Sequence, residues 1–266
     1  MRSLPGTPVV LLHGTAGKPS QWVGVVAALS GHEVRMPSLP GHGLLASQET
    51  GGWLADEAYQ IAMSAVGAGQ RVHLAGHSYG GAVALKLAMA FPERIKSLTL
   101  IEPAVFHLLR DGGALERQMY ADIAEVEVRL RKAHAAGDAM PGVRGFVDFW
   151  CGAGSFAALQ PEKQRALAAE ADRIIGNFTS IARENWLLNS CAMVKAPVMA
   201  ITGSESPVLV QHLSRYIAGA MDDAKVIQIS GAGHMLPVTH AATVAQLLAH
   251  HFQRAEAVSF RLRAAA

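Results

Sequence analysis

The stretch from Gly76 to Gly81, which reads GHSYGG, restricts the fold of this chain more than any other feature. A short apolar run, Arg71 to Ala75, precedes it, and a longer Ala-rich run, Ala82 to Phe91, follows it and ends at Pro92. The first run has the length of a strand, and the second has the length of a helix that a proline then stops. We therefore predict a strand-to-helix turn with Ser78 at its tip, where the small glycines let the two backbones come close.

Strand-like and helix-like segments alternate on both sides of this turn. Further segments of strand length lie at residues 8–12, 33–37, 97–102, 197–202 and 224–230, and helical segments lie at about 20–29, 52–67, 208–220 and 239–254. A continuous apolar run such as Val9 to Leu12 is typical of a strand buried on both faces of a parallel sheet. The alternation predicts an α/β fold, with an open, mostly parallel six-stranded sheet and helices on both faces.

The alternation stops after Glu102. No clear strand is visible from about residue 103 to 195, and apolar residues recur there at steps of three and four, as in an amphipathic helix. The residues of that stripe are Leu115, Met119, Ile123, Val126 and Leu130. Pro141 and Pro161 each have the character of a first helical turn. We predict a helical insertion at 104–195, and a core that consists of residues 1–103 and 196–266.

Composition excludes several classes of protein. The formal net charge is +2 over 266 residues, and no basic run interleaves with aromatic residues, so we expect no nucleic-acid partner. The first residues carry a four-residue apolar run, which is too short for a signal-peptide core or a membrane span, so we expect a cytoplasmic protein. The sequence leaves the oligomeric state open, with a homo-oligomer among the possible states.

No motif for a bound ion or cofactor is present. The chain lacks the phosphate loop Gly-x-x-x-x-Gly-Lys-Ser/Thr, the zinc motif His-Glu-x-x-His, and a dinucleotide fingerprint with its acidic partner. Cys151 and Cys191 lie forty residues apart and are expected to be small buried hydrophobic residues rather than a metal site. We predict no cofactor and no metal.

Four motifs resemble those of the α/β-hydrolase superfamily in their order and spacing. They are His13-Gly14 after the first strand, Pro37 to Gly43 after the second, GHSYGG, and Gly231-Ala232-Gly233-His234 after the last strand. The resemblance covers the chain from Val9 to about Phe252. It implies the hydrolase fold without its first antiparallel strands, with the helical insertion as a cap over the serine.

In this superfamily a serine nucleophile is followed along the chain by an acid and then by a histidine. The resemblance makes Ser78 the nucleophile and His234 the base, while the amides of Tyr79 and Thr15 form the oxyanion hole. A serine hydroxyl needs such a base, and the base needs a third group to hold its tautomer. His77, His13 and His42 lie in turns, and we expect structural or solvent-exposed roles for them.

The acid departs from the superfamily pattern. The usual position, three residues after the glycine of the penultimate strand, holds Ser206, which cannot stabilise an imidazolium as a carboxylate does. Glu205 is an alternative acid in the same loop. We favour Glu102, because it stands at the carboxyl end of a parallel strand and follows the apolar run Leu98 to Ile101. A branch of the superfamily that includes some haloalkane dehalogenases resembles this arrangement.

The resemblance implies a serine hydrolase that cleaves small hydrophobic carboxylic esters through an acyl-enzyme. Aromatic residues of the insertion, Phe106 and Trp150 among them, are candidates for the substrate pocket. The fold and a catalytic triad do not dictate the reaction, so a cofactor-free lyase or oxygenase is a second hypothesis. A non-catalytic ligand-binding protein is a third, favoured by the serine at position 206.

Overall fold

Six parallel strands form one open sheet in the computed structural model. The structure describes residues 6–29, 31–40, 54–67 and 69–264, without the side chains of residues 258–264. The strand order is β2-β1-β3-β4-β5-β6, and every pairing among the described strands is parallel. The strands are β1 (Val9–Leu12), β2 (Val34–Arg35), β3 (Val72–His77), β4 (Ile95–Ile101), β5 (Val198–Gly203) and β6 (Ala224–Ile229). The predicted sheet is confirmed.

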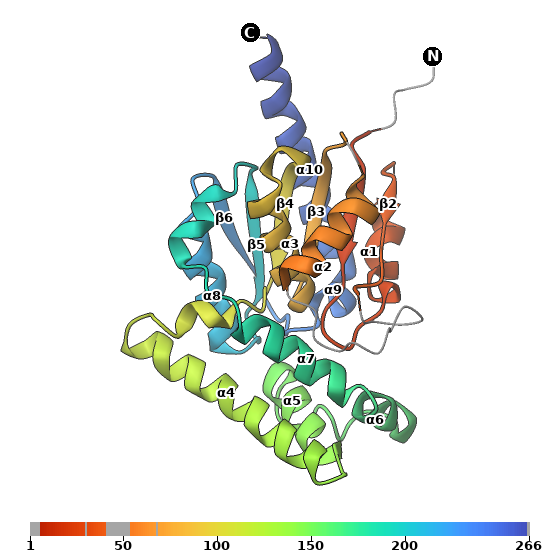
Figure 1. The fold of residues 1–266 in the computed structure, drawn as a ribbon. Helices are drawn as coiled ribbons and strands as arrows, with labels where there is room; N and C mark the ends of the chain where they lie inside the picture. The colour runs from red at the N-terminus through yellow and green to blue at the C-terminus, as the bar shows by residue number, and fades with distance from the viewer. Residues whose placement is uncertain (1–5, 30, 41–53, 68, 265–266) are drawn as a thin grey trace.

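Helices cover both faces of the sheet (Figure 1). Alternate strand residues point to opposite faces, so Val9 and Leu11 pack into one core while Val10 and Leu12 pack into the other. The first core includes residues of α1 (Val23–Ala28), which follows a 3₁₀ turn (Pro19–Trp22), and of α9 (Leu236–Thr239) and α10 (Ala241–Ala264). The second includes α2 (Leu54–Ile61), the π-helical turn Ala62–Val66, α3 (Tyr79–Ala90) and α8 (Val208–Ala218).

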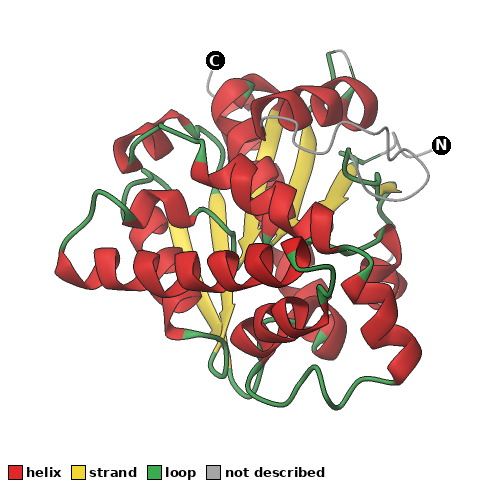
Figure 2. Cartoon of the chain, turned by 60° about the horizontal axis from the view of Figure 1, so that its bottom comes forward, coloured by secondary structure: helices red, strands yellow, loops and turns green. Residues whose placement is uncertain are grey.

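The segment between β4 and β5 contains only helices and turns, and it lies wholly within the described residues. It comprises α4 (Ala114–Ala135), α5 (Met140–Cys151), α6 (Pro161–Ala168) and α7 (Ala171–Ala182), with 3₁₀ turns at Phe106–Leu109 and Leu188–Met193. Because β4 leads directly into it, the segment lies at the carboxyl ends of the strands, where its helices cross the sheet edge (Figures 1 and 2). Its position places it over the strand-to-helix turn at Ser78.

Three details differ from the sequence prediction or lie outside the description. The sequence pattern places Leu115 in the buried stripe of α4, but this residue is 56% exposed, because the helix packs only from Met119 onward. The pattern also ends the last helix near Arg254, whereas the helix extends to Ala264, since its tail of Ala, Glu, Leu and Arg residues contains no Gly or Pro to stop it. Gly41, His42 and Gly43 lie outside the described residues.

None of the helices in the described part of the chain combines the length and the apolar character that crossing a membrane requires.

Candidate active site

Ser78 occupies the tip of the turn between β3 and α3, as the sequence predicts. Its backbone has φ 53° and ψ −119°, a conformation that residues other than glycine rarely adopt. The amides of Gly81 and Ala104 donate to the Ser78 carbonyl at 2.9 and 3.0 Å, and the Ser78 amide donates to Ile101 at 3.0 Å. The surrounding backbone therefore holds the serine in a strained geometry at the sheet edge.

Positive φ angles cluster at this edge. In the described residues, the non-glycine residues with positive φ are Ala16, Ser78 and Glu102. Each lies at or next to a candidate residue, since Ala16 directly follows Thr15, and Ser78 and Glu102 directly follow β3 and β4. Such strain costs about 1–3 kcal/mol per residue and persists only where the surroundings impose it. Its concentration here marks the carboxyl edge of the sheet as the candidate site.

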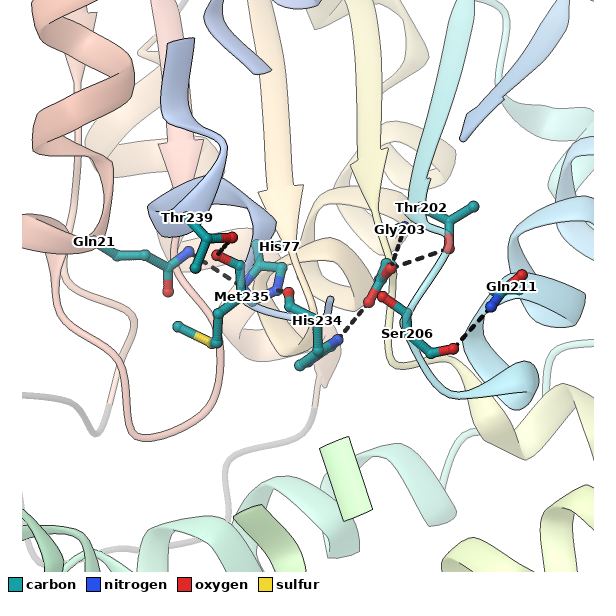
Figure 3. Close-up of polar contacts among 10 residues, drawn as sticks. Gln21, His77, Thr202, Gly203, Ser206, Gln211, His234, Met235 and Thr239 are labelled. Carbon is teal, nitrogen blue, oxygen red and sulfur yellow. Dashed lines mark hydrogen bonds and ion pairs between the residues drawn. The ribbon is translucent and has the colours of Figure 1, made fainter. Parts of the chain in front are cut away.

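The His234 ring lies against the Glu102 carboxylate. His234 Nδ1 is 2.6 Å from Glu102 Oε2, and the other carboxylate oxygen accepts hydrogen bonds from the Thr202 hydroxyl at 3.0 Å and the Gly203 amide at 2.7 Å (Figure 3). Glu102 is fully buried. Burial raises the pKa of the Glu102 carboxyl, but hydrogen bonds from His234, Ser206 and Gly203, with the charge of His234, lower it below its usual value. The carboxylate is therefore ionised at neutral pH.

Glu205, the alternative acid, is exposed, whereas His234 and Glu102 are buried. The Glu205 amide donates to the Ala232 carbonyl at 2.9 Å. Ser206, which stands at the usual acid position, is buried beside the Glu102 carboxylate instead (Figure 3). The usual acid position therefore holds a buried serine, while the carboxylate that contacts His234 comes from the end of the neighbouring strand β4.

Two aromatic rings flank His234. Trp150, from α5, stacks on it with ring centroids 4.8 Å apart and an interplanar angle of 26°. The His77 ring lies 4.8 Å from it on a tilted plane. His234 itself is only 5% exposed. The base candidate is thus enclosed between the sheet edge and the helical segment.

His77 has a structural role, which is one of the two roles expected for it, and it joins the turn after β1 to the loop after β6. Its Nε2 is 2.9 Å from the His234 carbonyl, and its Nδ1 is 3.1 Å from Gln21 Nε2 (Figure 3). Gln21 Oε1 in turn accepts from the Gly14 amide at 3.3 Å. Burial lowers the pKa of His77 to about 3, so the neutral ring accepts from Gln21 at Nδ1 and donates to the His234 carbonyl from Nε2.

No local pattern marks this role, because Gln21 and His234 lie 56 and 157 residues away from His77 along the chain.

A narrow cavity opens beside Ser78, between the sheet edge and the helical segment. Phe106 and Trp150, the two pocket candidates, both line it. The other lining residues are Thr15, Ser78, Ala104, Phe146, Asn177, Phe178 and Ile181. None of these side chains carries a charge. Asn177 is the polar lining residue that the sequence analysis missed, because one asparagine in an amphipathic helix gives no signal of its own.

Thr15 and Tyr79, the oxyanion-hole candidates, both lie near Ser78. Thr15 lines the cavity in the turn after β1, and Tyr79 is the first residue of α3. The first amides of a helix point along its axis at its positive end. The Tyr79 side chain points elsewhere, into a buried polar cluster.

That cluster joins the core to the helical segment. The Tyr79 hydroxyl donates to Glu57 Oε1 of α2 at 2.8 Å and lies 3.3 Å from the Ser180 hydroxyl of α7. Burial raises the pKa of Glu57 to about 7, although the Tyr79 hydrogen bond and the charge of Arg173 oppose the rise. The Glu57 carboxyl therefore keeps its proton to a higher pH than an ordinary glutamate does.

Replacement of Glu57 by Gln is expected to become more favourable to stability, relative to wild type, as the pH rises. A carboxyl whose pKa is raised in the folded state contributes stability below pH 4.5, and this contribution is lost as the pH rises to about 7. Glutamine does not titrate, so the variant's advantage over wild type should grow by about 3 kcal/mol across that range.

Urea unfolding at pH 4.5 and pH 8 measures this difference. The exposed Glu93→Gln serves as the control, with no growth in the difference expected. An equal difference between Glu57→Gln and wild type at both pH values would contradict a raised pKa.

No group of three or more His, Cys, Asp or Glu in the part of the chain that the structure describes is arranged to hold a metal ion. Cys151 and Cys191 are both free thiols; Cys191 is buried, but Cys151 is exposed, contrary to the expectation that both are buried.

Comparison with known proteins identifies the family. The sequence model of the alpha/beta hydrolase fold matches residues 7–241. The chain belongs to this family. The strand order, the turn at Ser78 and the position of His234 after the last strand agree with it.

Several curated relatives are similar to this hydrolase-fold chain. The dihydrolipoyllysine-residue acetyltransferase component of the acetoin cleaving system of Pseudomonas putida is 40% identical, over 91% of this chain and 62% of that protein. Lipase 3 of Moraxella sp. (strain TA144) is 32% identical over 39% of this chain, and the match spans only 34% of that lipase. A pimeloyl-[acyl-carrier protein] methyl ester esterase of Aromatoleum aromaticum is 26% identical, over 90% of this chain and 96% of that protein.

Solved structures share the fold at lower identity. A bacterial membrane phospholipase A superposes with a TM-score of 0.74 at 21% identity, covering 94% of this chain and 80% of that one. MenH from S. aureus superposes with a TM-score of 0.74 at 16% identity, covering 96% of each chain. These likenesses extend through the helical segment as well as the sheet.

Proposed function

We propose that this protein is a serine hydrolase that cleaves small hydrophobic carboxylic esters, with Ser78 as nucleophile, His234 as base and Glu102 as acid. The observation that carries the proposal is the contact of 2.6 Å between His234 Nδ1 and a buried carboxylate at the edge that holds Ser78 in a strained turn. Trp150 links His234 to Ser78, because it stacks on the His234 ring and lines the same cavity as Ser78.

The reaction proceeds in two acyl transfers. As Ser78 Oγ attacks the ester carbonyl carbon, His234 Nε2 takes the hydroxyl proton, and Glu102 stabilises the imidazolium. The amides of Tyr79 and Thr15 donate hydrogen bonds to the carbonyl oxygen, on which the negative charge develops. Collapse of this intermediate expels the alcohol, which takes the proton from His234. A water molecule then gives a proton to His234 and attacks the carbonyl carbon of the acyl-enzyme. The bond from that carbon to Ser78 Oγ breaks, the carboxylic acid leaves, and His234 returns the proton to Ser78 Oγ.

The cavity supports a small uncharged substrate. Its walls are mainly aromatic and aliphatic, and none of its described lining residues is charged. The names of relatives agree with ester chemistry, since they include a methyl ester esterase and lipases. A charged substrate would lose its hydration in this cavity without gaining an ionic partner.

We also propose the division into a core of residues 1–103 and 196–266 and a cap of residues 104–195. Five of the residues that line the cavity come from α5 and α7 of the helical segment: Phe146, Trp150, Asn177, Phe178 and Ile181. A segment that supplies one wall of the cavity while the sheet edge supplies the other acts as a cap. A cytoplasmic location, the absence of a cofactor and homo-oligomer formation remain predictions.

Incubation with p-nitrophenyl butyrate and with a serine-directed phosphonate tests the proposed activity. We expect ester turnover, and a phosphonate adduct on Ser78 that peptide mass spectrometry locates and that the Ser78→Ala variant lacks. The exposed Ser64→Ala is the matched control and should behave as wild type. Labelling of Ser78 without turnover would favour lyase or oxygenase chemistry instead. The absence of both labelling and turnover would favour a non-catalytic protein.

A further inference from the structure

Two side chains, Gln21 and His77, connect the turn after β1 to the loop of the base candidate through a chain of hydrogen bonds (Figure 3). Gln21 Oε1 lies 3.3 Å from the Gly14 amide nitrogen, and Gln21 Nε2 lies 3.1 Å from His77 Nδ1. The other ring nitrogen of His77 lies 2.9 Å from the His234 carbonyl oxygen. We call these two side chains the Gln21–His77 bridge.

The two ends of the bridge fix the direction of its hydrogen bonds. A backbone amide can only donate, so Gly14 bonds to the carboxamide oxygen of Gln21 and leaves the nitrogen to face His77. A carbonyl can only accept, so His234 requires the proton of His77 on Nε2. The neutral ring then accepts at Nδ1, and burial, which lowers the pKa of His77 to about 3, keeps it neutral. All three bonds therefore agree on one arrangement of protons.

Each point that the bridge joins lies next to a group of the proposed mechanism. Gly14 directly precedes Thr15, and His77 directly precedes Ser78. The turn also packs closely on the ring, because a Cβ atom at Gly14 would lie 3.1 Å from His77 Nδ1 and 3.3 Å from Ser78 Cβ. The third point is the carbonyl of His234, the base itself.

His234 is held at two separate points. Glu102 contacts its ring at Nδ1, 2.6 Å away, whereas His77 contacts the backbone from which that ring extends. His77 is only 2% exposed, so water does not readily replace it at the carbonyl. A displacement of the His234 backbone would move Nε2 relative to Ser78 Oγ, and a misplacement of about 1 Å can cost about 100-fold in rate.

We propose that Gln21 and His77 are positioning residues, which hold the loop of the base and the turn of the oxyanion hole in a fixed relation to Ser78. This inference rests on the proposed function of the same site. Neither Gln21 nor His77 is among the described residues that line the cavity. The bridge therefore acts on the reacting groups rather than on the bound ester, and its loss lowers kcat with little change in KM.

Steady-state kinetics of Gln21→Met and His77→Phe on p-nitrophenyl butyrate test the bridge. We expect each variant to lower kcat by about 10- to 100-fold with KM nearly unchanged. The double variant should fall no further than the weaker single variant, because either substitution already disconnects the two ends. The exposed Gln253→Met and His250→Phe are the matched controls. Wild-type kcat in both Gln21→Met and His77→Phe would overturn the inference.

The variant His77→Gln separates hydrogen bonding from the packing of the ring. A glutamine at this position offers an oxygen that accepts from Gln21 and an amide that donates to His234. We expect His77→Gln to keep about tenfold more of kcat than His77→Phe. Circular dichroism verifies that each variant is folded. An equal loss in the two variants would show that the shape of the ring matters rather than its hydrogen bonds, and would overturn the inference.

NMR of the histidine ring nitrogens separates this inference from the proposed function, because it requires no turnover. We expect His77 to carry a proton on Nε2 alone between about pH 5 and pH 9. The ring signals of His234 should shift in Gln21→Met and stay in place in Gln253→Met. If wild type hydrolyses no ester, the proposed function fails, yet these signals still support the bridge.

Two results of the NMR experiment would overturn the bridge. One is an unmoved His234 signal in Gln21→Met. The other is a proton on His77 Nδ1 in wild type, which decides the matter even where a variant does not fold.

Discussion

Replacement of Glu102 by Gln is expected to lower kcat for ester hydrolysis by about 10⁴-fold, the size of effect known for loss of the orienting carboxylate in a serine protease. Glutamine keeps the length of the side chain and an oxygen that accepts from Thr202 and Gly203. It cannot stabilise a protonated His234, and its amide favours the wrong ring tautomer. The substitution thus removes the charge and little of the packing.

Steady-state kinetics on p-nitrophenyl butyrate measures the effect, with KM expected to change little because the carboxylate does not line the cavity. Glu205→Gln is the matched control, since it removes the same charge from the alternative acid. Full activity in Glu102→Gln together with its loss in Glu205→Gln would reverse the assignment of the acid.

Replacement of Gly76 by Ala is expected to lower the free energy of unfolding by about 3 kcal/mol or more. A Cβ atom at this position would lie 2.2 Å from the Gly80 carbonyl oxygen and 2.8 Å from Gly81 Cα. These are backbone atoms of the turn and of α3, so no side chain can move aside to make room. Relief of the overlap would have to displace the helix from the strand and with it Ser78.

Urea unfolding of Gly76→Ala and of Gly145→Ala gives the comparison. Gly145 is an exposed residue of α5, and a Cβ atom there would meet no atom within 4 Å, so alanine should stabilise the helix by about 0.5–1 kcal/mol. Stability of Gly76→Ala within about 1 kcal/mol of wild type would show that the turn tolerates a side chain.

The layered fold followed from local patterns. Each strand of the sheet centre is buried on both faces, so its apolar run is visible in the sequence without knowledge of any neighbour. Local patterns are less informative where burial is one-sided or absent. They predict a buried Leu115, which is exposed, and a last helix that ends near Arg254, ten residues before its end at Ala264.

The candidate site divides in the same way. The turn that holds Ser78 is a local structure, which nearby glycines and apolar runs announce. The sequence also named Glu102, but it left Glu205 open as an alternative, because His234 lies 132 residues beyond Glu102 along the chain. No local pattern marked Asn177, Gln21 or His77, whose contacts join α7, the turn after β1 and the loop after β6.

By itself, the sequence determined the alternation of strands and helices, the helical segment and the turn at Ser78, because each depends on residues that are neighbours along the chain. Only the tertiary structure decided what surrounds that serine. Parallel pairing of β4 and β5 sets Ile101 beside Ile201, which brings Glu102 to the hydroxyl of Thr202 and the amide of Gly203. Strand register and helix packing are non-local, so the partners of a buried carboxylate or amide appear only when the chain is folded.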